Sequence, residues 1–178
     1  MSIRIRAITD EDIAAVCELY NHYVINTTIT FETEPLSVEE YTERVKGVCA
    51  RYPFLVAEDE GRIVGFAYLS PFNVRHAYRF VADLSLYVDH EEKGKGIGSL
   101  LMKAIEEEAR NMHLHQLFSL ITSENENSRT FHEKHGFVYK VSFADTGFKF
   151  NRWLGVDYYV KVLEGPCENP LEVEWHHA

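Results

Sequence analysis

The chain has 178 residues, of which 46% are hydrophobic and 13% aromatic, enough for one globular domain with a substantial core. Its formal net charge of −10 argues against nucleic acid or a membrane as the main partner, because such anionic partners attract basic proteins. No signal peptide or membrane-spanning run is visible, and the nine histidines show no metal-ligand spacing. The cysteines Cys17, Cys49 and Cys167 are odd in number and widely spaced. We therefore expect a cytoplasmic protein with free thiols and no metal.

The first part of the chain predicts a strand, two helices and a hairpin. Residues 3–7 alternate between apolar and polar side chains, as a short strand does. Apolar residues at helical spacing from Ile13 to Val24 predict the first helix, and a capping box that opens at Ser37 predicts the second. Two strands at 54–58 and 62–69 flank an Asp-Glu-Gly turn and form the hairpin.

The rest of the chain alternates strands with helices. We predict a strand at 80–88, a helix at 98–111, a strand at 117–122, a helix at 128–135, and strands at 138–143 and 157–163 joined by a link rich in Gly, Lys and Trp. No repeat or low-complexity linker divides the chain, so residues 1–164 are expected to form a single domain. Residues 165–178 are an acidic tail, which we expect to pack loosely.

The most informative motif joins the strand at 80–88 to the helix that follows it. From Lys93 to Gly98 the chain reads K-G-K-G-I-G, and glycines let a backbone approach a phosphate while free N–H groups at the helix start point at it. The spacing is neither that of a P-loop nor G-x-G-x-x-G. Lys93, Lys95 and Lys103 make this region a cationic island that suits a small polyanion. The alternative is a helix cap without a ligand, for which three glycines are an unnecessary entropic cost.

Two motifs resemble those of a known family. The spacing K-x-x-G-x-G resembles the pyrophosphate loop of the GNAT superfamily of acetyl-CoA-dependent N-acetyltransferases, where Arg or Gln stands at the position of Lys93. The segment N-E-N-S-R-T-F-H-E-K-H-G-F, residues 125–137, resembles the second motif of that family. The resemblance spans about residues 3–163. It implies an α/β (α+β) fold with a central mixed, mostly antiparallel sheet flanked by helices in the order β-α-α-β-β-β-α-β-α-β-β.

Further segments resemble one branch of that family, the phosphinothricin acetyltransferases, whose relatives also acetylate methionine sulfone and methionine sulfoximine. These segments are residues 20–23, 30–35, 51–58, 75–80 and 147–154. The resemblance implies direct transfer of acetyl from acetyl-CoA to the α-amino group of a small amino acid or analogue in a ternary complex, by a homodimer. Two alternatives stay open: a GNAT enzyme that acts on another amine, such as a peptide N-terminus or a polyamine, and a non-catalytic acyl-CoA-binding regulator.

The resemblance also assigns coenzyme contacts. Backbone N–H groups near two residues of the central strand would pair with the pantetheine arm, the glycine loop would hold the pyrophosphate, and two residues of the second motif would touch the coenzyme. The predicted coenzyme-binding residues are Leu86, Val88, Lys93, Gly94, Lys95, Gly96, Ile97, Gly98, Ser99, Asn125 and Ser128.

Asp83 is the candidate general base. It stands where the resembled branch has Glu, and alternation along the strand places it on one face with Ser85 and Tyr87. A carboxylate in an otherwise apolar strand is unusual. Asp is one methylene shorter than Glu, so we expect it to act through a water molecule. The alternative is a structural Asp that caps a turn or pairs with Arg75 or Arg79.

The remaining candidates surround the reacting groups. His132 is the candidate acid for the leaving thiolate, by its position in the second motif, and the alternative is a histidine that only donates and accepts hydrogen bonds. Arg75 is the candidate clamp for a substrate carboxylate, because guanidinium binds carboxylate through two parallel hydrogen bonds. The candidate walls of the substrate pocket, each of which could instead belong to the core, are Phe31, Tyr78, Phe80, Phe148, Lys149 and Trp153.

Overall fold

A computed structural model describes residues 3–176 and contains a seven-stranded sheet. The strands are β1 (Arg4–Ala7), β2 (Phe54–Asp59), β3 (Arg62–Pro71), β4 (Val81–Val88), β5 (Gln116–Thr122), β6 (Val138–Lys149) and β7 (Arg152–Val162). They lie in the order β1-β2-β3-β4-β5-β7-β6, and all neighbours are antiparallel except β4 and β5. The mixed, mostly antiparallel sheet that the sequence predicted is confirmed.

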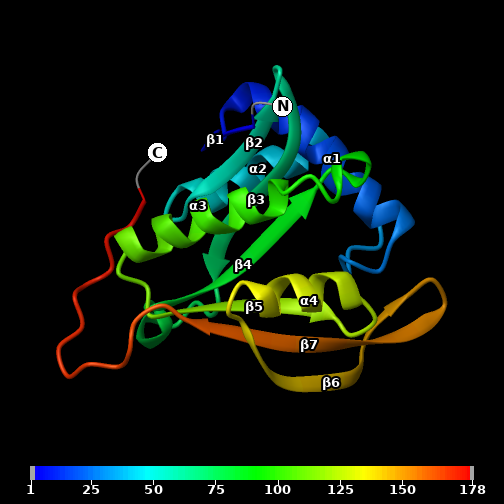
Figure 1. Ribbon diagram of the computed structural model, residues 1–178. Helices are drawn as coiled ribbons and strands as arrows, with labels where there is room; N and C mark the ends of the chain where they lie inside the picture. The colour runs from blue at the N-terminus through cyan, green and yellow to red at the C-terminus, as the bar shows by residue number, and fades with distance from the viewer. Residues whose placement is uncertain (1–2, 177–178) are drawn as a thin grey trace.

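Helices cover the two faces of the sheet unequally (Figure 1). Their bounds are α1 (Ile13–Asn26), α2 (Val38–Cys49), α3 (Ile97–Asn111) and α4 (Glu126–Lys134). The two N-terminal helices pack with Phe54, Val56 and Phe66 of the hairpin on one face, whereas α3 and α4 lie on the other. Because the first pair reaches only the N-terminal half of the sheet, the same face of β5, β7 and β6 carries no helix of the described chain. No helix among residues 3–176 is long and apolar enough to cross a membrane.

The link predicted between the last two strands is wrong. β6 and β7 form one long hairpin instead, and Phe150 and Asn151 turn the chain with positive φ angles of 52° and 58°. Positive φ at both central positions suits the twist of a two-residue hairpin. β6 also contains register shifts between Tyr139 and Val141 and between Phe143 and Gly147, which break the alternation on which strand prediction depends.

The tail also departs from the expectation of loose packing. Its residues 165–172 are exposed, but Val173 is buried against the core and Trp175 packs on Tyr52, with ring centroids 5.6 Å apart. The guanidinium of Arg51 lies over the Trp175 ring, 5.5 Å from its centroid. The apolar residues alternate in L-E-V-E-W, residues 171–175, and of these Val173 and Trp175 hold this end of the tail on the domain, whereas Leu171 is exposed.

Candidate active site

The two central strands of the sheet separate from each other after a short stretch of pairing. β4 and β5 are in register only from Val81 opposite Gln116 to Asp83 opposite Phe118. Beyond Asp83, β4 continues to Val88 beside β3 alone. The second half of β4 therefore has one hydrogen-bonding edge that no neighbouring strand takes up.

That free edge offers N–H groups to a ligand. The N–H of Asp89 donates to Val64 O on β3 at 2.9 Å, so the residues that alternate with it point the other way. Val88 and Leu86 therefore direct their N–H and C=O groups into the gap. The Val88 carbonyl already accepts a hydrogen bond from the hydroxyl of Tyr23, whereas the two N–H groups face the opening.

The glycine loop forms the end of this gap. Gly94 and Gly96 have φ angles of 81° and 82°, a left-handed conformation that other residues rarely adopt, and α3 begins directly after Gly96. A Cβ on either residue would stand in open space, so the loop leaves room for a ligand beside its backbone. A Cβ on Gly98 would lie 3.3 Å from the ring of Phe131, so this glycine lets α3 and α4 approach each other. The first N–H groups of α3 have no partner inside the helix and suit an anion.

Together these parts enclose a cleft of about 580 Å³. Its lining residues are Tyr23, Ile29, Leu86, Tyr87, Val88, Glu92, Lys93, Gly94, Gly96, Ile97, Gly98, Ser99, Asn125, Asn127, Ser128, Phe131 and His132. Every predicted coenzyme residue is among them except Lys95, whose ammonium bonds the buried carboxylate of Glu92 at 2.5 Å. Asn125 also caps α4, because its side-chain oxygen accepts from the Ser128 N–H at 3.1 Å.

His132 reaches the cleft but both of its ring nitrogens are engaged. Nδ1 lies 2.8 Å from the carbonyl oxygen of Ser128, and Nε2 lies 2.9 Å from the hydroxyl of Ser119 on β5. A carbonyl can only accept, so Nδ1 carries the proton and Nε2 accepts from Ser119. Burial lowers the pKa of His132 to about 4, which keeps the ring neutral at pH 7. These contacts favour a hydrogen-bonding role, one of the two interpretations that the sequence left open.

Asp83 has the opposite environment for an ionisable group. Its Oδ1 is buried, and it has no hydrogen-bond partner among the residues that the structure describes. Burial alone raises the pKa of Asp83 to about 7. Neither Arg75 nor Arg79 compensates for this burial, since Arg79 binds Glu172 at 3.0 Å instead. A half-protonated carboxyl at the point where β4 and β5 separate is poised to exchange a proton near neutral pH.

An aromatic group adjoins Asp83 on β5. Phe118, its neighbour in register, stacks on Phe72 with centroids 4.3 Å apart, and Tyr78 lies 5.7 Å from Phe72. Tyr78 thus belongs to an aromatic group that includes the register neighbour of Asp83, and its role as a pocket wall stays a prediction. Phe80 lies elsewhere, because it packs against the core on the α3 side and lines a separate pocket under the tail.

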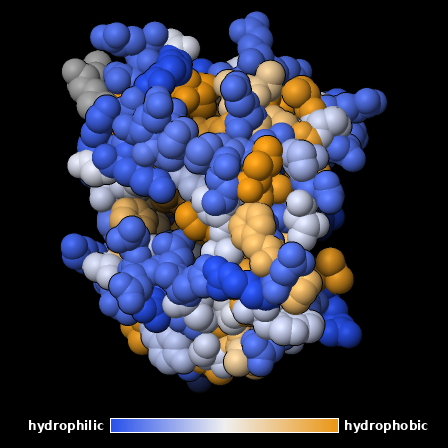
Figure 2. Space-filling view, turned by 90° about the vertical axis from the view of Figure 1, so that its right-hand side faces the viewer, coloured by the Kyte–Doolittle hydropathy of each residue, from blue (hydrophilic) through white to orange (hydrophobic). Residues whose placement is uncertain are grey.

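The other predicted wall residues divide between two places. Phe31 packs on the hairpin, because a Cβ on Gly147 would lie 2.4 Å from its ring, and the buried ammonium of Lys149 donates to Thr30 O at 2.9 Å. Phe148 and Trp153 instead pair with each other at the exposed hairpin tip. The side of the molecule that carries this tip shows apolar side chains among hydrophilic ones (Figure 2).

The family follows from this geometry together with a comparison of sequences. The sequence profile of the family described as "Acetyltransferase (GNAT) domain" matches residues 5–156. The chain belongs to the GNAT acetyltransferases.

Curated relatives and solved structures agree with this assignment. Phosphinothricin N-acetyltransferase of Streptomyces viridochromogenes is 32% identical over 93% of this chain and 90% of its own. L-methionine sulfoximine/L-methionine sulfone acetyltransferase of Salmonella typhimurium is 30% identical over 86% of this chain and 91% of its own. The structure of a GNAT superfamily phosphinothricin acetyltransferase from Sinorhizobium meliloti in complex with AcCoA superimposes with a TM-score of 0.90, at 30% identity and over 100% of both chains. The family predicted from sequence is confirmed, and the chain is an acetyl-CoA-dependent acetyltransferase.

The cleft of this GNAT protein fits acetyl-CoA. It combines the edge of β4 at Leu86 and Val88, where β5 no longer pairs, with left-handed glycines and a helix start, which suit a carbonyl-bearing arm and a pyrophosphate. Within residues 3–176, no three His, Cys, Asp or Glu side chains are grouped so that they could hold a metal ion.

Six residues that line the cleft of the GNAT protein were not predicted from the sequence. They are Tyr23, Ile29, Tyr87, Glu92, Asn127 and Phe131. Asn127 and Phe131 lie inside the second motif. Phe131 follows Ser128 by three residues, so helical spacing could have indicated it, whereas Asn127 has no such spacing from Asn125 or Ser128. Tyr23 and Ile29 come from α1 and the chain after it, and no local pattern links them to β4.

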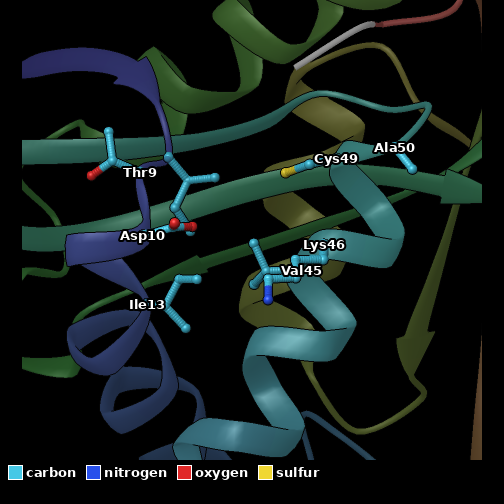
Figure 3. A pocket seen from close by; sticks show the side chains of 8 residues that line it. Thr9, Asp10, Ile13, Val45, Lys46, Cys49 and Ala50 are labelled. Atoms are coloured by element: carbon cyan, nitrogen blue, oxygen red, sulfur yellow. The ribbon is translucent and has the colours of Figure 1, made fainter.

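A second pocket, which shares no lining residue with this cleft, lies between the start of α1 and the end of α2 (Figure 3). Its volume is about 380 Å³, and Ile13, Val45 and Cys49 contribute apolar walls. Burial raises the pKa of the Cys49 thiol, so the thiolate is disfavoured and the pocket offers no activated nucleophile.

Proposed function

We propose that this enzyme transfers acetyl from acetyl-CoA to the α-amino group of a small amino acid or analogue of the phosphinothricin, methionine sulfone or methionine sulfoximine type. The names of the relatives support this substrate class. The observation that carries the proposal is the partnerless carboxyl of Asp83, which stands at the inner end of the gap between β4 and β5. An amine that enters there would meet a proton acceptor beside the coenzyme cleft.

In this proposal the protein holds the coenzyme mainly through its backbone. The N–H groups of Leu86 and Val88 and the amides from Lys93 to Ser99 bind the pantetheine arm and the pyrophosphate, with Asn125 and Ser128 on the opposite wall. When bound, acetyl-CoA supplies the acetyl group as a thioester. The chain contributes by placing donor and amine side by side, an effect that accounts for much of the rate in two-substrate reactions.

Asp83 then accepts the amine proton. It lies three residues before Leu86, roughly 10 Å along an extended strand, so a water molecule bridges the distance more readily than direct contact. An α-amino group has a pKa of about 8, so a base of pKa about 7 receives its proton with little loss of free energy. The acid role of His132 stays a prediction, and it would require the ring to exchange its contacts with Ser119 and Ser128.

A screen of acetyl acceptors tests the proposed function. Thiol release from acetyl-CoA would be measured with methionine sulfone, methionine sulfoximine, phosphinothricin, polyamines and short peptides. Turnover restricted to the three amino-acid analogues supports the proposal. Turnover confined to polyamines or peptides would show that the enzyme acts on another class of amine. Coenzyme binding without any turnover would contradict the proposed function. Cytoplasmic localisation stays a prediction.

We predict that Arg75→Ala raises the KM for the amino-acid substrate about tenfold or more and leaves the KM for acetyl-CoA nearly unchanged. Arg75 is exposed just before the short helix His76–Tyr78, and its guanidinium has no partner among the residues that the structure describes. A charged hydrogen bond to a substrate carboxylate contributes about 1.5–3 kcal/mol, which is a factor of about ten to a hundred. Steady-state kinetics in both substrates measure the effect.

A blocked substrate supplies the control for Arg75. The wild-type enzyme should discriminate strongly between the free acid and its carboxamide, and Arg75→Ala should lose that discrimination. Equal kinetics of the wild-type enzyme on the free acid and the carboxamide would show that Arg75 does not bind the substrate carboxylate. Arg79→Ala serves as the matched variant, because this neighbouring arginine is bound to Glu172.

We propose that the uncovered face of the C-terminal half-sheet is the surface of a homodimer. Leu120, Tyr158 and Val141 are neighbours in register on β5, β7 and β6, and the ring of Phe143 lies 5.6 Å from that of Tyr158. Leu120, Val141 and Phe143 are exposed. A second copy of this chain is the occupant that the family resemblance implies, and a contiguous apolar face of this kind favours association.

Phe143→Asp should therefore convert the protein to a monomer. The charge would have to be buried without a partner in the interface, which costs several kcal/mol. Sedimentation equilibrium across a range of protein concentrations measures the molecular mass. Val38→Asp is the matched control, since Val38 is as exposed but lies at the start of α2. A wild-type protein that sediments as a monomer would contradict the proposal.

A further inference from the structure

Tyr23 contacts both the end of β4 and the glycine loop at the coenzyme cleft, although nothing in its sequence neighbourhood indicates this. It lies near the end of α1, and its side chain is almost completely buried. Its hydroxyl donates to the carbonyl oxygen of Val88 at the end of β4. The ammonium of Lys93, the first residue of the glycine loop, lies 5.3 Å from the centroid of its ring. One side chain thus joins a helix, a strand end and the loop.

The contact with Val88 changes what the strand end offers to a ligand. Both the N–H and the C=O of Val88 point into the gap, because the neighbouring Asp89 is turned toward β3. Val88 is the last residue of β4, and its side chain adjoins Gly98 of the glycine loop, where an added Cβ would lie 3.7 Å from it. A bare carbonyl at this position would direct its negative end toward the anion that the loop is proposed to hold. The tyrosine hydroxyl occupies this acceptor, while the N–H stays available. Burial, and to a smaller extent Asp89, raises the pKa of Tyr23 to about 12, so the hydroxyl keeps the proton that it donates.

The contact with Lys93 acts in the same direction. A cation over the face of an aromatic ring is attracted by the negative charge of that face. The ring of Tyr23 therefore holds the Lys93 ammonium at the rim of the cleft, and Lys93 and Tyr23 both line the space beside Gly94 and Gly96. Lys95, the other lysine of the loop, is bound to Glu92. Lys93 is thus the loop cation that Tyr23 keeps beside the cleft.

We propose that Tyr23 is a positioning residue for the anionic part of acetyl-CoA: it covers the Val88 carbonyl and places the Lys93 charge next to the pyrophosphate. The inference rests on the proposed location of the coenzyme in this cleft. A purely structural role would depend on ring packing against Tyr87, whose centroid is 5.4 Å away, and phenylalanine would preserve that packing. The hydroxyl and the ring can therefore be tested separately.

The decisive variant is Tyr23→Phe, assayed with two acetyl donors. Acetyl-CoA carries the pyrophosphate, whereas S-acetylpantetheine has the same thioester arm without any phosphate. We expect kcat/KM for acetyl-CoA to fall about three- to tenfold, the range of one hydrogen bond, mainly through KM. For S-acetylpantetheine it should change less than about twofold, since the lost contact acts on the anion. Tyr41→Phe is the control, because Tyr41 is equally buried on α2 and does not line the cleft.

A second pair of variants tests the ring. Tyr23→Leu should weaken acetyl-CoA binding in calorimetry more than Tyr23→Phe does. In the Tyr23→Leu background, Lys93→Gln should cause almost no further loss of affinity, because the Lys93 ammonium no longer has the tyrosine ring beneath it. An equal loss for both donors in Tyr23→Phe, no loss for either, or full additivity of Tyr23→Leu with Lys93→Gln would overturn the inference. Gly96→Val distinguishes failure of this inference from failure of the proposed coenzyme site. If Gly96→Val abolishes acetyl-CoA binding while Tyr23→Phe changes nothing, only the role of Tyr23 is wrong. If Gly96→Val also leaves the affinity for acetyl-CoA unchanged, the proposed site is wrong.

Discussion

Replacing Gly96 with valine should abolish acetyl-CoA binding, with at least about a hundredfold loss of affinity in calorimetry, while the protein stays folded. Gly96 caps α3 with a φ of 82°, where a side chain costs roughly 1–2 kcal/mol and a β-branched one more. Relief of that strain turns the amides at the start of α3 away from the cleft. A valine that keeps the conformation instead places its methyl groups in the open space that the loop leaves for the coenzyme.

Gly61→Val is the matched control for this result. Gly61 has a φ of 83°, and a Cβ there would also meet nothing within 4 Å, but it lies in the turn between β2 and β3. Both variants should lose similar stability, measured by thermal unfolding, and only Gly96→Val should lose the coenzyme. Equal binding defects in the two proteins would mean that strain alone disturbs the fold. Unchanged affinity in Gly96→Val would mean that the anion binds elsewhere.

Asp83→Asn should lower kcat about a hundredfold or more, because asparagine has nearly the same size and cannot accept the proton. Burial raises the pKa of Asp83 to about 7, so the wild-type rate should rise with pH through this value as the carboxylate forms. The variant should instead gain rate only at higher pH, as more of the amine loses its proton in solvent. Asp83→Glu should retain activity, because it restores the carboxylate one methylene further out. Turnover of Asp83→Asn at the wild-type rate from about pH 6 to 9, the window around the amine pKa, would make the carboxyl structural.

The same substitution should stabilise the protein at high pH. The carboxyl of Asp83 has a higher pKa in the folded than in the unfolded chain, so its contribution to stability is complete below about pH 4 and is lost as the pH rises through about 7. Asn does not ionise, so the free energy of unfolding of Asp83→Asn should exceed that of the wild type at pH 8 and match it more closely at pH 4. Thermal unfolding at both values measures the difference.

Asp157→Asn provides a control of opposite sign. Burial would raise the pKa of Asp157, but the hydroxyl of Ser123 at 2.6 Å, together with Ser142 and Arg129, outweighs burial and lowers it. Its ionised form therefore stabilises the fold, and Asp157→Asn should lower the melting temperature at pH 8. If both variants were destabilised alike, the raised pKa of Asp83 would not describe its state in the protein.

The parts of the fold that the sequence predicts well are those determined by local pattern. The capping box at Ser37 is formed, with the Glu40 N–H donating to the serine oxygen at 3.2 Å and the Glu40 carboxylate accepting from the Ser37 N–H at 2.8 Å. The glycine loop has the left-handed angles for which only glycine is well suited. The β6–β7 hairpin was missed because Phe150 and Asn151 turn it without glycine, and because two register shifts interrupt the alternation of β6.

The residues of the site likewise divide into those that a local motif predicts and those that only the folded chain brings together. Residues that belong to the two motifs line the cleft, because each motif folds as one unit at α3 or α4. The bond from Tyr23 to Val88 joins residues 65 positions apart, and no periodicity encodes such a contact. Aromatic composition does not reveal which side of the sheet a ring occupies, and the ring of Phe80 packs on the α3 side.

The short pairing of β4 with β5 also affects how the molecule resists unfolding. Three paired positions join the four strands from β1 to β4 with the three strands β5, β7 and β6. A ligand that fills the gap beyond Asp83 bonds one half of the sheet on its strand edge and packs on α4, which is fixed to the other half. The ligand thereby adds contacts between two halves of the sheet that are otherwise paired at only three positions. Because such a ligand binds the folded chain and not the unfolded one, the free energy of unfolding of this enzyme should rise with the concentration of its acetyl donor.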